Sequence, residues 1–180
     1  MMTIATPLSL ALKDYARRWP GEPATALFED FLRQAPEAFE RSHREGHFTG
    51  SSWLVSADGE RCLLTHHRKL NRWLQLGGHA DGDVDLARVA LREAEEESGL
   101  DGLRVETAIF DLDRHWIPVR GNEPGHWHYD VRYVVRAGGN EAFAISEESL
   151  ALAWQPIRTL AEAADTDDSL RRMAHKWLTR

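Results

Sequence analysis

The chain has 180 residues, of which 42% are hydrophobic and 28% charged, and its formal net charge is −7. This length and composition are typical of one globular domain with a sizeable core. The negative charge argues against binding to nucleic acid through bulk electrostatics, and the sequence has no apolar run long enough to span a membrane. We therefore expect neither nucleic acid nor a membrane as a partner.

Two features of the sequence bear on the cellular compartment. The apolar N-terminal stretch is not preceded by a basic segment, so we expect no signal peptide. Cys62 is the only cysteine, which excludes an internal disulfide bond and fits a reducing cytoplasm. We therefore expect a cytoplasmic protein, with Cys62 as a small core residue inside an apolar run.

The N-terminal part of the sequence has the periodicity of helices, with apolar residues every three to four positions. Helices are expected over residues 8–19 and 27–32, with a short third helix from Pro36. We interpret residues 1–46 as a helical extension of a core at 47–180, both within a single domain of 1–180. A homodimer contact through these helices is the alternative.

From residue 48 onward the pattern changes to short strands separated by turns, and Asp58-Gly59 is a strong hairpin signal. Strands are expected over residues 51–57, 61–66, 73–76, 104–111, 128–135 and 152–156, with helices over 84–98 and from about 168. Mixed strands with one central and one final helix favour an α/β/α sandwich around a mixed β-sheet, to which the N-terminal helices are added.

The most informative segment runs from Gly77 to Leu100, GGHADGDVDLARVALREAEEESGL. In a helix, Glu93, Glu96 and Glu97 lie on one face at i, i+3 and i+4. Like charges at this spacing repel unless a cation lies between them, and Mg²⁺ prefers carboxylate oxygens while keeping waters for phosphate ligands. The segment therefore predicts metal-assisted chemistry on a phosphate compound. A solvated acidic face is the alternative.

The surroundings of these glutamates favour a site. Gly77-Gly78 allows the backbone to approach a ligand or metal closely, and Arg92 lies one turn before Glu96 and can orient it. The expected helix caps are Asp83 or Asp85 at the start and Gly99 at the end.

This block resembles the Nudix box, G-x5-E-x7-R-E-U-x-E-E-x-G-U, in which U is a bulky aliphatic residue. The matching positions are Gly78, Arg92-Glu93, Glu96-Glu97 and Gly99-Leu100. Two positions depart from the pattern, because Val84 stands in place of the first glutamate and Ala94 in place of the bulky aliphatic residue.

The resemblance implies the Nudix fold and a hydrolase that cleaves the diphosphate bond of a nucleoside diphosphate linked to another moiety, by water attack on phosphorus. It implies Mg²⁺, or Mn²⁺, bound by Glu93, Glu96, Glu97 and the carbonyl oxygen of Gly78. Arg92 is expected to hold one glutamate in place. Which glutamate acts as base stays open, because clustered carboxylates titrate as a group.

Two other functions are weighed against this one. A catalytically weak Nudix-fold ligand-binding or sensor protein is the main alternative, to which the loss of the first box glutamate at Val84 points. An isopentenyl diphosphate isomerase is disfavoured, because Cys62 lacks the sequence setting of a catalytic cysteine.

A further carboxylate is expected outside the box. Residues 146–154 resemble an E-E-x5-W element that some Nudix relatives place before a late strand. Glu148 is the first choice and Glu147 the second, with an ordinary acidic surface loop as the alternative.

Histidine-rich segments flank the box. In a strand, alternation places His126, His128 and Asp130 on one face. We interpret the segment as a substrate contact, in which imidazoles donate to phosphate and a tryptophan stacks on a base. A wet strand face and a separate three-ligand metal site are the alternatives. The candidate substrate-binding residues are Arg72, His79, His115, Trp116, His126 and His128. The sequence does not specify which diphosphate is bound.

Overall fold

The structure is a computed structural model that describes residues 7–147 and 149–180. Its helices are α1 (Pro7–Arg18), α2 (Pro23–Gln34), α3 (Leu86–Ser98), α4 (Ile157–Glu162) and α5 (Asp168–Leu178). Its strands are β1 (Gly46–Val55), β2 (Arg61–His67), β3 (Arg72–Leu74), β4 (Leu76–His79), β5 (Arg104–Ile117), β6 (His126–Arg136) and β7 (Ser149–Pro156).

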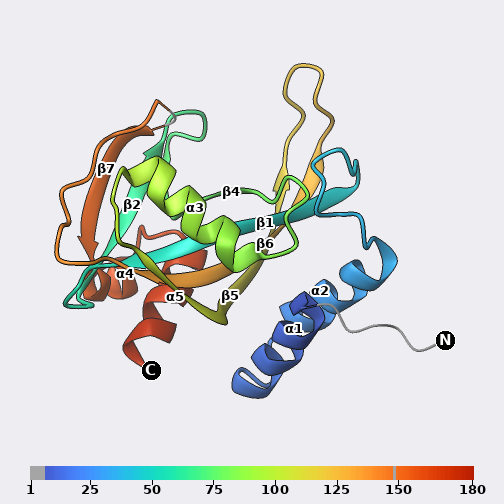
Figure 1. Cartoon of the computed structure of the whole chain (residues 1–180), viewed down its shortest axis with the longest axis horizontal. Helices are drawn as coiled ribbons and strands as arrows, with labels where there is room; N and C mark the ends of the chain where they lie inside the picture. The colour runs from blue at the N-terminus through green and yellow to red at the C-terminus, as the bar shows by residue number, and fades with distance from the viewer. Residues whose placement is uncertain (1–6, 148) are drawn as a thin grey trace.

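Within the described residues, seven strands form one mixed sheet around β1 (Figure 1). β6 pairs in parallel with β1 along its whole length, and β5 pairs antiparallel with β6 at the outer edge. On its other side β1 pairs antiparallel with β4 and, through Val55, with β2, which also pairs with β3 and β7. The mixed sheet confirms the expected fold class.

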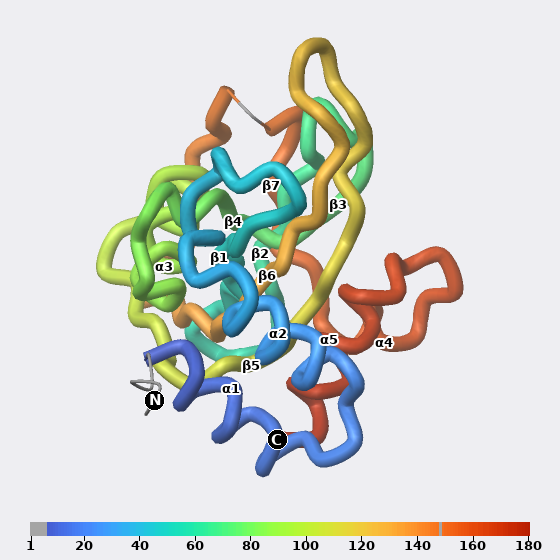
Figure 2. The backbone as a smooth tube through the Cα atoms, turned by 90° about the vertical axis from the view of Figure 1, so that its right-hand side faces the viewer, coloured from blue at the N-terminus to red at the C-terminus, as the bar shows by residue number. Residues whose placement is uncertain are grey.

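Helices cover both faces of the sheet, with α3 on one side and α4 and α5 on the other (Figure 2). Successive side chains of β1 point to opposite faces of the sheet, so this strand contacts both helical layers. Gly50 faces α3 so closely that an added Cβ would lie 2.8 Å from the backbone oxygen of Leu86. Trp53 points the opposite way and packs with Met173 of α5. Both layers therefore bury apolar surface against β1.

The N-terminal helices pack against the sheet instead of standing apart. Leu12 of α1 and Phe28 of α2 are fully buried in the same cluster as Phe48 of β1. Phe31 stacks on Tyr129 of β6, with ring centroids 3.7 Å apart. Apolar burial of this kind stabilises the attachment of α1 and α2 to the core.

Several predicted boundaries were wrong. Residues 36–39 form turns in place of a third helix, because the carbonyl oxygens of Ala38 and Phe39 accept hydrogen bonds from Phe48 and Gly82. β5 and β6 extend beyond their predicted ends, since their polar residues also pair across the sheet, and β1 spans Gly46–Val55 instead of 51–57. The short helix α4 was not predicted. The Asp58-Gly59 turn is confirmed, with Gly59 at φ +74°.

Among the described helices, none combines the length and the apolar character that a transmembrane segment needs.

Candidate active site

Helix α3 begins and ends at the residues expected from the sequence. Asp85 caps the start, where its Oδ1 accepts a 3.1 Å hydrogen bond from the backbone N–H of Arg88. Gly99 ends the helix in the left-handed conformation at φ +66°, and its N–H donates to Glu95 at 2.8 Å. Asp83 does not cap; it pairs with the guanidinium of Arg88 at 2.6 Å, which lowers the pKa of the Asp83 carboxyl.

The glycine pair lies directly against two of the three glutamates. The backbone N–H of Gly77 donates to Glu97 Oε1 at 2.8 Å. A Cβ added to Gly78 would overlap the carboxylate of Glu93. Gly78 is therefore needed for the close approach between β4 and the Glu93 side chain.

Arg92 holds Glu93, whereas the sequence pointed to Glu96, one turn further along the helix. Its Nη2 donates to Glu93 Oε1 at 2.9 Å and to the carbonyl oxygen of His79 at 3.2 Å. The hydrogen bond to Glu93 raises the pKa of the Arg92 guanidinium. The arginine thereby links the carboxylate of α3 to the end of β4.

The electrostatics of α3 favour a bound cation. Glu95, Glu96 and Glu97 occupy the last turn of the helix, which contains no basic residue. The C-terminal end of a helix carries partial negative charge, so carboxylates there are unfavourable. The side chains of Glu93 and Glu97 are half-buried and that of Glu96 is exposed. A divalent metal ion at this face would relieve the repulsion, so these residues fit Mg²⁺ or Mn²⁺.

The remaining box position lies elsewhere. Val84 is 52% exposed and lines a shallow cleft with Leu8 of α1 and Tyr133 of β6. This cleft contains none of the three glutamates. Val84, one of the two positions that depart from the box, therefore faces α1.

Of the two candidate carboxylates outside the box, Glu147 and Glu148, the structure describes only one. Glu148 lies outside the described residues. Glu147 is an exposed turn residue whose carbonyl oxygen accepts a 3.0 Å hydrogen bond from Arg68. Arg72 faces the start of α5, with its Nη1 3.7 Å from Asp167 Oδ2.

The sheet places three of the predicted histidines around His47, which the sequence analysis missed, and a fourth, His115, beside His128. His115 pairs across the sheet with His128, and His128 pairs with His47. The ring of His79 lies 5.0 Å from both His47 and His128, and His126 lies 5.0 Å from His128. The alternation His47, Thr49, Ser51 along β1 was the signal available in the sequence.

The imidazoles are held in different ways. Both ring nitrogens of His47 are buried without a hydrogen-bond partner of ordinary geometry among the described residues. Burial lowers the pKa of His47 to about 4 and that of His128 to about 2. Burial, with Arg41 2.8 Å from its Nδ1, also lowers the pKa of His79. These rings are therefore neutral at neutral pH.

Asp130 and Trp116 are separated from the histidines. Asp130 accepts hydrogen bonds from Thr49, Ser51 and Arg132 in a buried network. Trp116 is 49% exposed and packs edge-on against Trp127. Because neighbouring strand residues face opposite ways, Trp116 lies on the other side of β5 from the preceding histidine.

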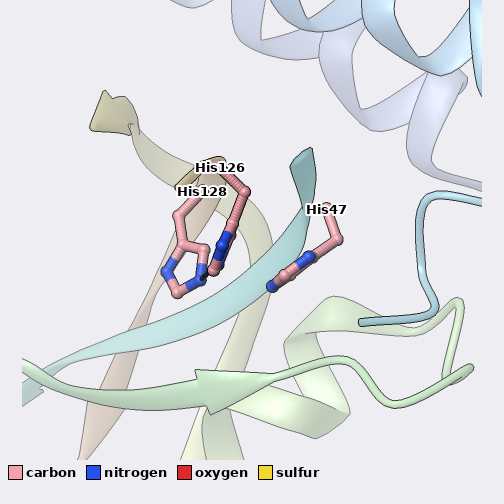
Figure 3. Close-up of side chains that lie close together, drawn as sticks. All are labelled: His47, His126 and His128. Atoms are coloured by element: carbon pink, nitrogen blue, oxygen red, sulfur yellow. Dashed lines mark hydrogen bonds between the residues drawn. The ribbon is translucent and has the colours of Figure 1, made fainter. Parts of the chain in front are cut away.

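Within the described ranges, the imidazoles of His47, His126 and His128 form one group that could hold a metal ion, with ligand atoms all within 4.8 Å of one another (Figure 3). The carboxylates of Glu93, Glu96 and Glu97 share a face of α3 but do not form such a group in the described part of the chain.

Comparison with solved structures identifies the same fold in known proteins. The Ap4A hydrolase of C. elegans, solved as a binary complex, has a TM-score of 0.57 at 15% identity, over 73% of this chain and 95% of that chain. A NUDIX-family hydrolase from Clostridium perfringens has a TM-score of 0.55 at 21% identity, over 76% and 97%. A UDP-X diphosphatase has a TM-score of 0.54 at 14% identity, over 94% and 90%.

No curated protein matches the sequence significantly. The family model of the NUDIX domain matches residues 47–177, well over half of the chain. The chain therefore belongs to the Nudix hydrolase superfamily of enzymes.

Proposed function

We propose that the protein is a divalent-metal-dependent hydrolase that cleaves the diphosphate bond of a nucleoside diphosphate linked to another moiety. The observation that carries this proposal is the acidic face of α3 against the glycine pair of β4. There the Gly77 N–H orients Glu97, and Gly78 lies against the carboxylate of Glu93.

Mg²⁺ is the proposed metal, with Mn²⁺ as a substitute. The residues that would hold it are Glu93, Glu96, Glu97 and the carbonyl oxygen of Gly78. When bound, such an ion neutralises the diphosphate and lowers the pKa of a coordinated water. The fit rests on the carboxylates gathered toward the C-terminal end of α3, whose last turn contains no basic residue.

The chain's own residues orient the carboxylates and accept the proton of the attacking water. Arg92 donates to Glu93 Oε1, and the Gly77 N–H donates to Glu97 Oε1, so both side chains are positioned by hydrogen bonds. We propose a member of the triplet as the base, with Glu93 as first candidate. Glu148 is proposed as an additional carboxylate.

A nucleotide-derived diphosphate is the proposed substrate class. Two proteins of the same fold are named for what they act on, Ap4A in one and UDP-X in the other. Arg41 and Arg44, with Glu123 among others, line a polar cleft of about 570 Å³ beside the sheet and offer two guanidinium groups to a diphosphate. The proposed substrate contacts among the predicted residues are Arg72, His79, His115 and Trp116.

The test is product release from a panel of diphosphates with Mg²⁺ or Mn²⁺. The panel contains nucleotide sugars, ADP-ribose, dinucleoside polyphosphates, nucleoside triphosphates and coenzyme A. Hydrolysis in ¹⁸O-labelled water should place the label on a phosphate product, because water attacks phosphorus.

Metal-dependent cleavage of one class by the wild type, lost in Glu97→Gln, supports the proposal. Binding of a nucleotide without turnover in any metal would contradict it and favour a ligand sensor. Glu95→Gln is the matched control, because Glu95 is exposed on the same turn and lies outside the acidic triplet.

A further inference from the structure

Three imidazoles from two neighbouring strands face one another at one end of the sheet (Figure 3). One ring nitrogen from each of His47, His126 and His128 lies within 4.8 Å of the others. The Nε2 atoms of His126 and His128 are 3.1 Å apart and share a hydrogen bond, whose proton a metal ion would replace. Nitrogens bound to one tetrahedral Zn²⁺ lie about 3.3 Å apart, so two of the three already have the spacing of ligands.

The hydrogen bonds of His126 decide which of its nitrogens can bind a metal ion. The carbonyl oxygen of Pro124, which only accepts, lies 2.9 Å from His126 Nδ1. Nδ1 therefore carries the proton, and the neutral ring presents a lone pair at Nε2, toward His128. A backbone carbonyl on the second nitrogen is the usual way in which metal-binding histidines are oriented.

His47 supplies an independent observation. It is 2% exposed, and its ring centroid lies 4.8 Å from those of His126 and His128. Neither of its ring nitrogens has a hydrogen-bond partner of ordinary geometry in the described part of the chain, only a weaker contact with the backbone of His43, although buried polar atoms normally have one. A metal ion between the three rings would provide that partner.

The cluster lies on the opposite face of the sheet from α3. His47 and Gly50 point to opposite sides of β1, because they are three positions apart and successive strand residues alternate in direction, and Gly50 faces α3. Imidazole ligands favour late first-row metals such as Zn²⁺, whereas carboxylates favour Mg²⁺. The two sets of ligands are therefore different sites with different preferences.

We propose that His47, His126 and His128 bind one late first-row divalent metal ion, Zn²⁺ by preference, and thereby tie the β5–β6 hairpin to β1. Three protein ligands leave a fourth position for water or an exchangeable ligand. This assigns His126 and His128 to metal binding in place of direct substrate contact. The proposal is independent of the proposed hydrolysis.

Metal titration of the full chain tests the site without an activity assay. Chelator-treated protein is titrated with Co²⁺ and then with Zn²⁺, with visible absorption and elemental analysis as readouts. We expect one equivalent of Co²⁺ with the strong visible bands of a tetrahedral nitrogen site, displaced by Zn²⁺ but not by excess Mg²⁺. One equivalent of Zn²⁺ should also shift the ¹⁵N signals of the three imidazoles in the wild type.

Variants separate this site from the carboxylates. The double variant His126→Gln, His128→Gln should bind Zn²⁺ on the order of 100-fold more weakly or worse. His175→Gln, an exposed histidine of α5, and the double variant Glu93→Gln, Glu97→Gln should bind like the wild type. Unshifted imidazole signals in the wild type, or tight binding by the double histidine variant, would overturn the proposal. So would loss of tight binding in the glutamate variant.

Discussion

The backbone N–H of Gly77 donates a 2.8 Å hydrogen bond to Glu97 Oε1. This bond joins β4 to the last turn of α3 and orients one carboxylate of the acidic triplet before any ligand arrives. Positioning by backbone atoms costs no side-chain entropy on the β4 side. The glycine pair therefore serves both as a close-approach surface, at Gly78, and as a hydrogen-bond donor, at Gly77.

Replacing Gly78 with alanine should lower activity much more than stability. The added Cβ would overlap the carboxylate of Glu93, which is the end of a flexible side chain and can move away. We expect Gly78→Ala to cost less than about 1 kcal/mol in the free energy of unfolding while reducing kcat/KM at least about tenfold. Steady-state kinetics and urea denaturation check both values.

Gly139→Ala is the control for this change, because nothing lies within 4 Å of a Cβ at that position. Full activity of Gly78→Ala would contradict the assigned position of Glu93.

Neutralising Glu96 should stabilise the metal-free protein. The side chain is exposed at the C-terminal end of α3, beside other carboxylates. Removing this charge relieves repulsion with the helix dipole and the neighbouring acids, worth about 0.3–1 kcal/mol. Thermal unfolding of Glu96→Gln and wild type in EDTA, then in Mg²⁺, is the measurement. The advantage should shrink or reverse with Mg²⁺; a variant less stable than wild type in EDTA would count against the charge argument.

Metal-free protein should lose stability as the pH falls below about 6.5. Burial holds the pKa of His47 at about 4 and of His128 at about 2, while an unfolded histidine titrates near about 6.5. Below that pH the unfolded chain binds protons that the folded chain does not. The free energy of unfolding therefore falls by up to about 1.4 kcal/mol per pH unit for each such histidine. Above it, both states are neutral and this contribution is complete.

The groups facing His47 are His79, His126, His128 and the guanidinium of Arg41. Urea denaturation at pH 7.5 and 5.5 should therefore give a clear loss for wild type and a smaller loss for His47→Gln. Equal stability at the two pH values would refute the burial of neutral rings.

Breaking the buried ion pairs of Lys176 should destabilise the whole fold. Its Nζ lies 2.8 Å from Asp111 Oδ1, 2.6 Å from Glu22 Oε1 and 2.5 Å from the hydroxyl of Tyr15. Lys176→Met would leave buried acids with fewer partners, at a cost of about 3 kcal/mol. Lys13→Met, at an exposed position of α1, should change stability by less than about 0.5 kcal/mol. Similar unfolding midpoints for Lys176→Met and Lys13→Met would mean that the contacts of Lys176 do not hold α1 to α5.

Local signals made α3 predictable from the sequence. Asp85, Gly99 and the spacing of the glutamates act within the helix itself, so their geometry follows from the helical period. The short helix predicted from Pro36 was wrong. The chain forms turns there instead, because the carbonyl oxygens of these residues accept hydrogen bonds from distant backbone N–H groups. His47 was missed for a related reason. Its alternation with Thr49 and Ser51 indicates a shared strand face, but the histidines beside it come from β6, through a parallel pairing of distant segments.

The charge of Glu97 tests the central claim most directly. Gln at this position keeps an amide oxygen that can accept the hydrogen bond of Gly77, but it removes the negative charge. With Mg²⁺ and the best diphosphate of the panel, Glu97→Gln should lose about 10²- to 10⁴-fold in kcat/KM, while the matched variant Glu95→Gln keeps wild-type activity. Equal activity of Glu97→Gln and Glu95→Gln would contradict the assignment of α3 as the catalytic helix.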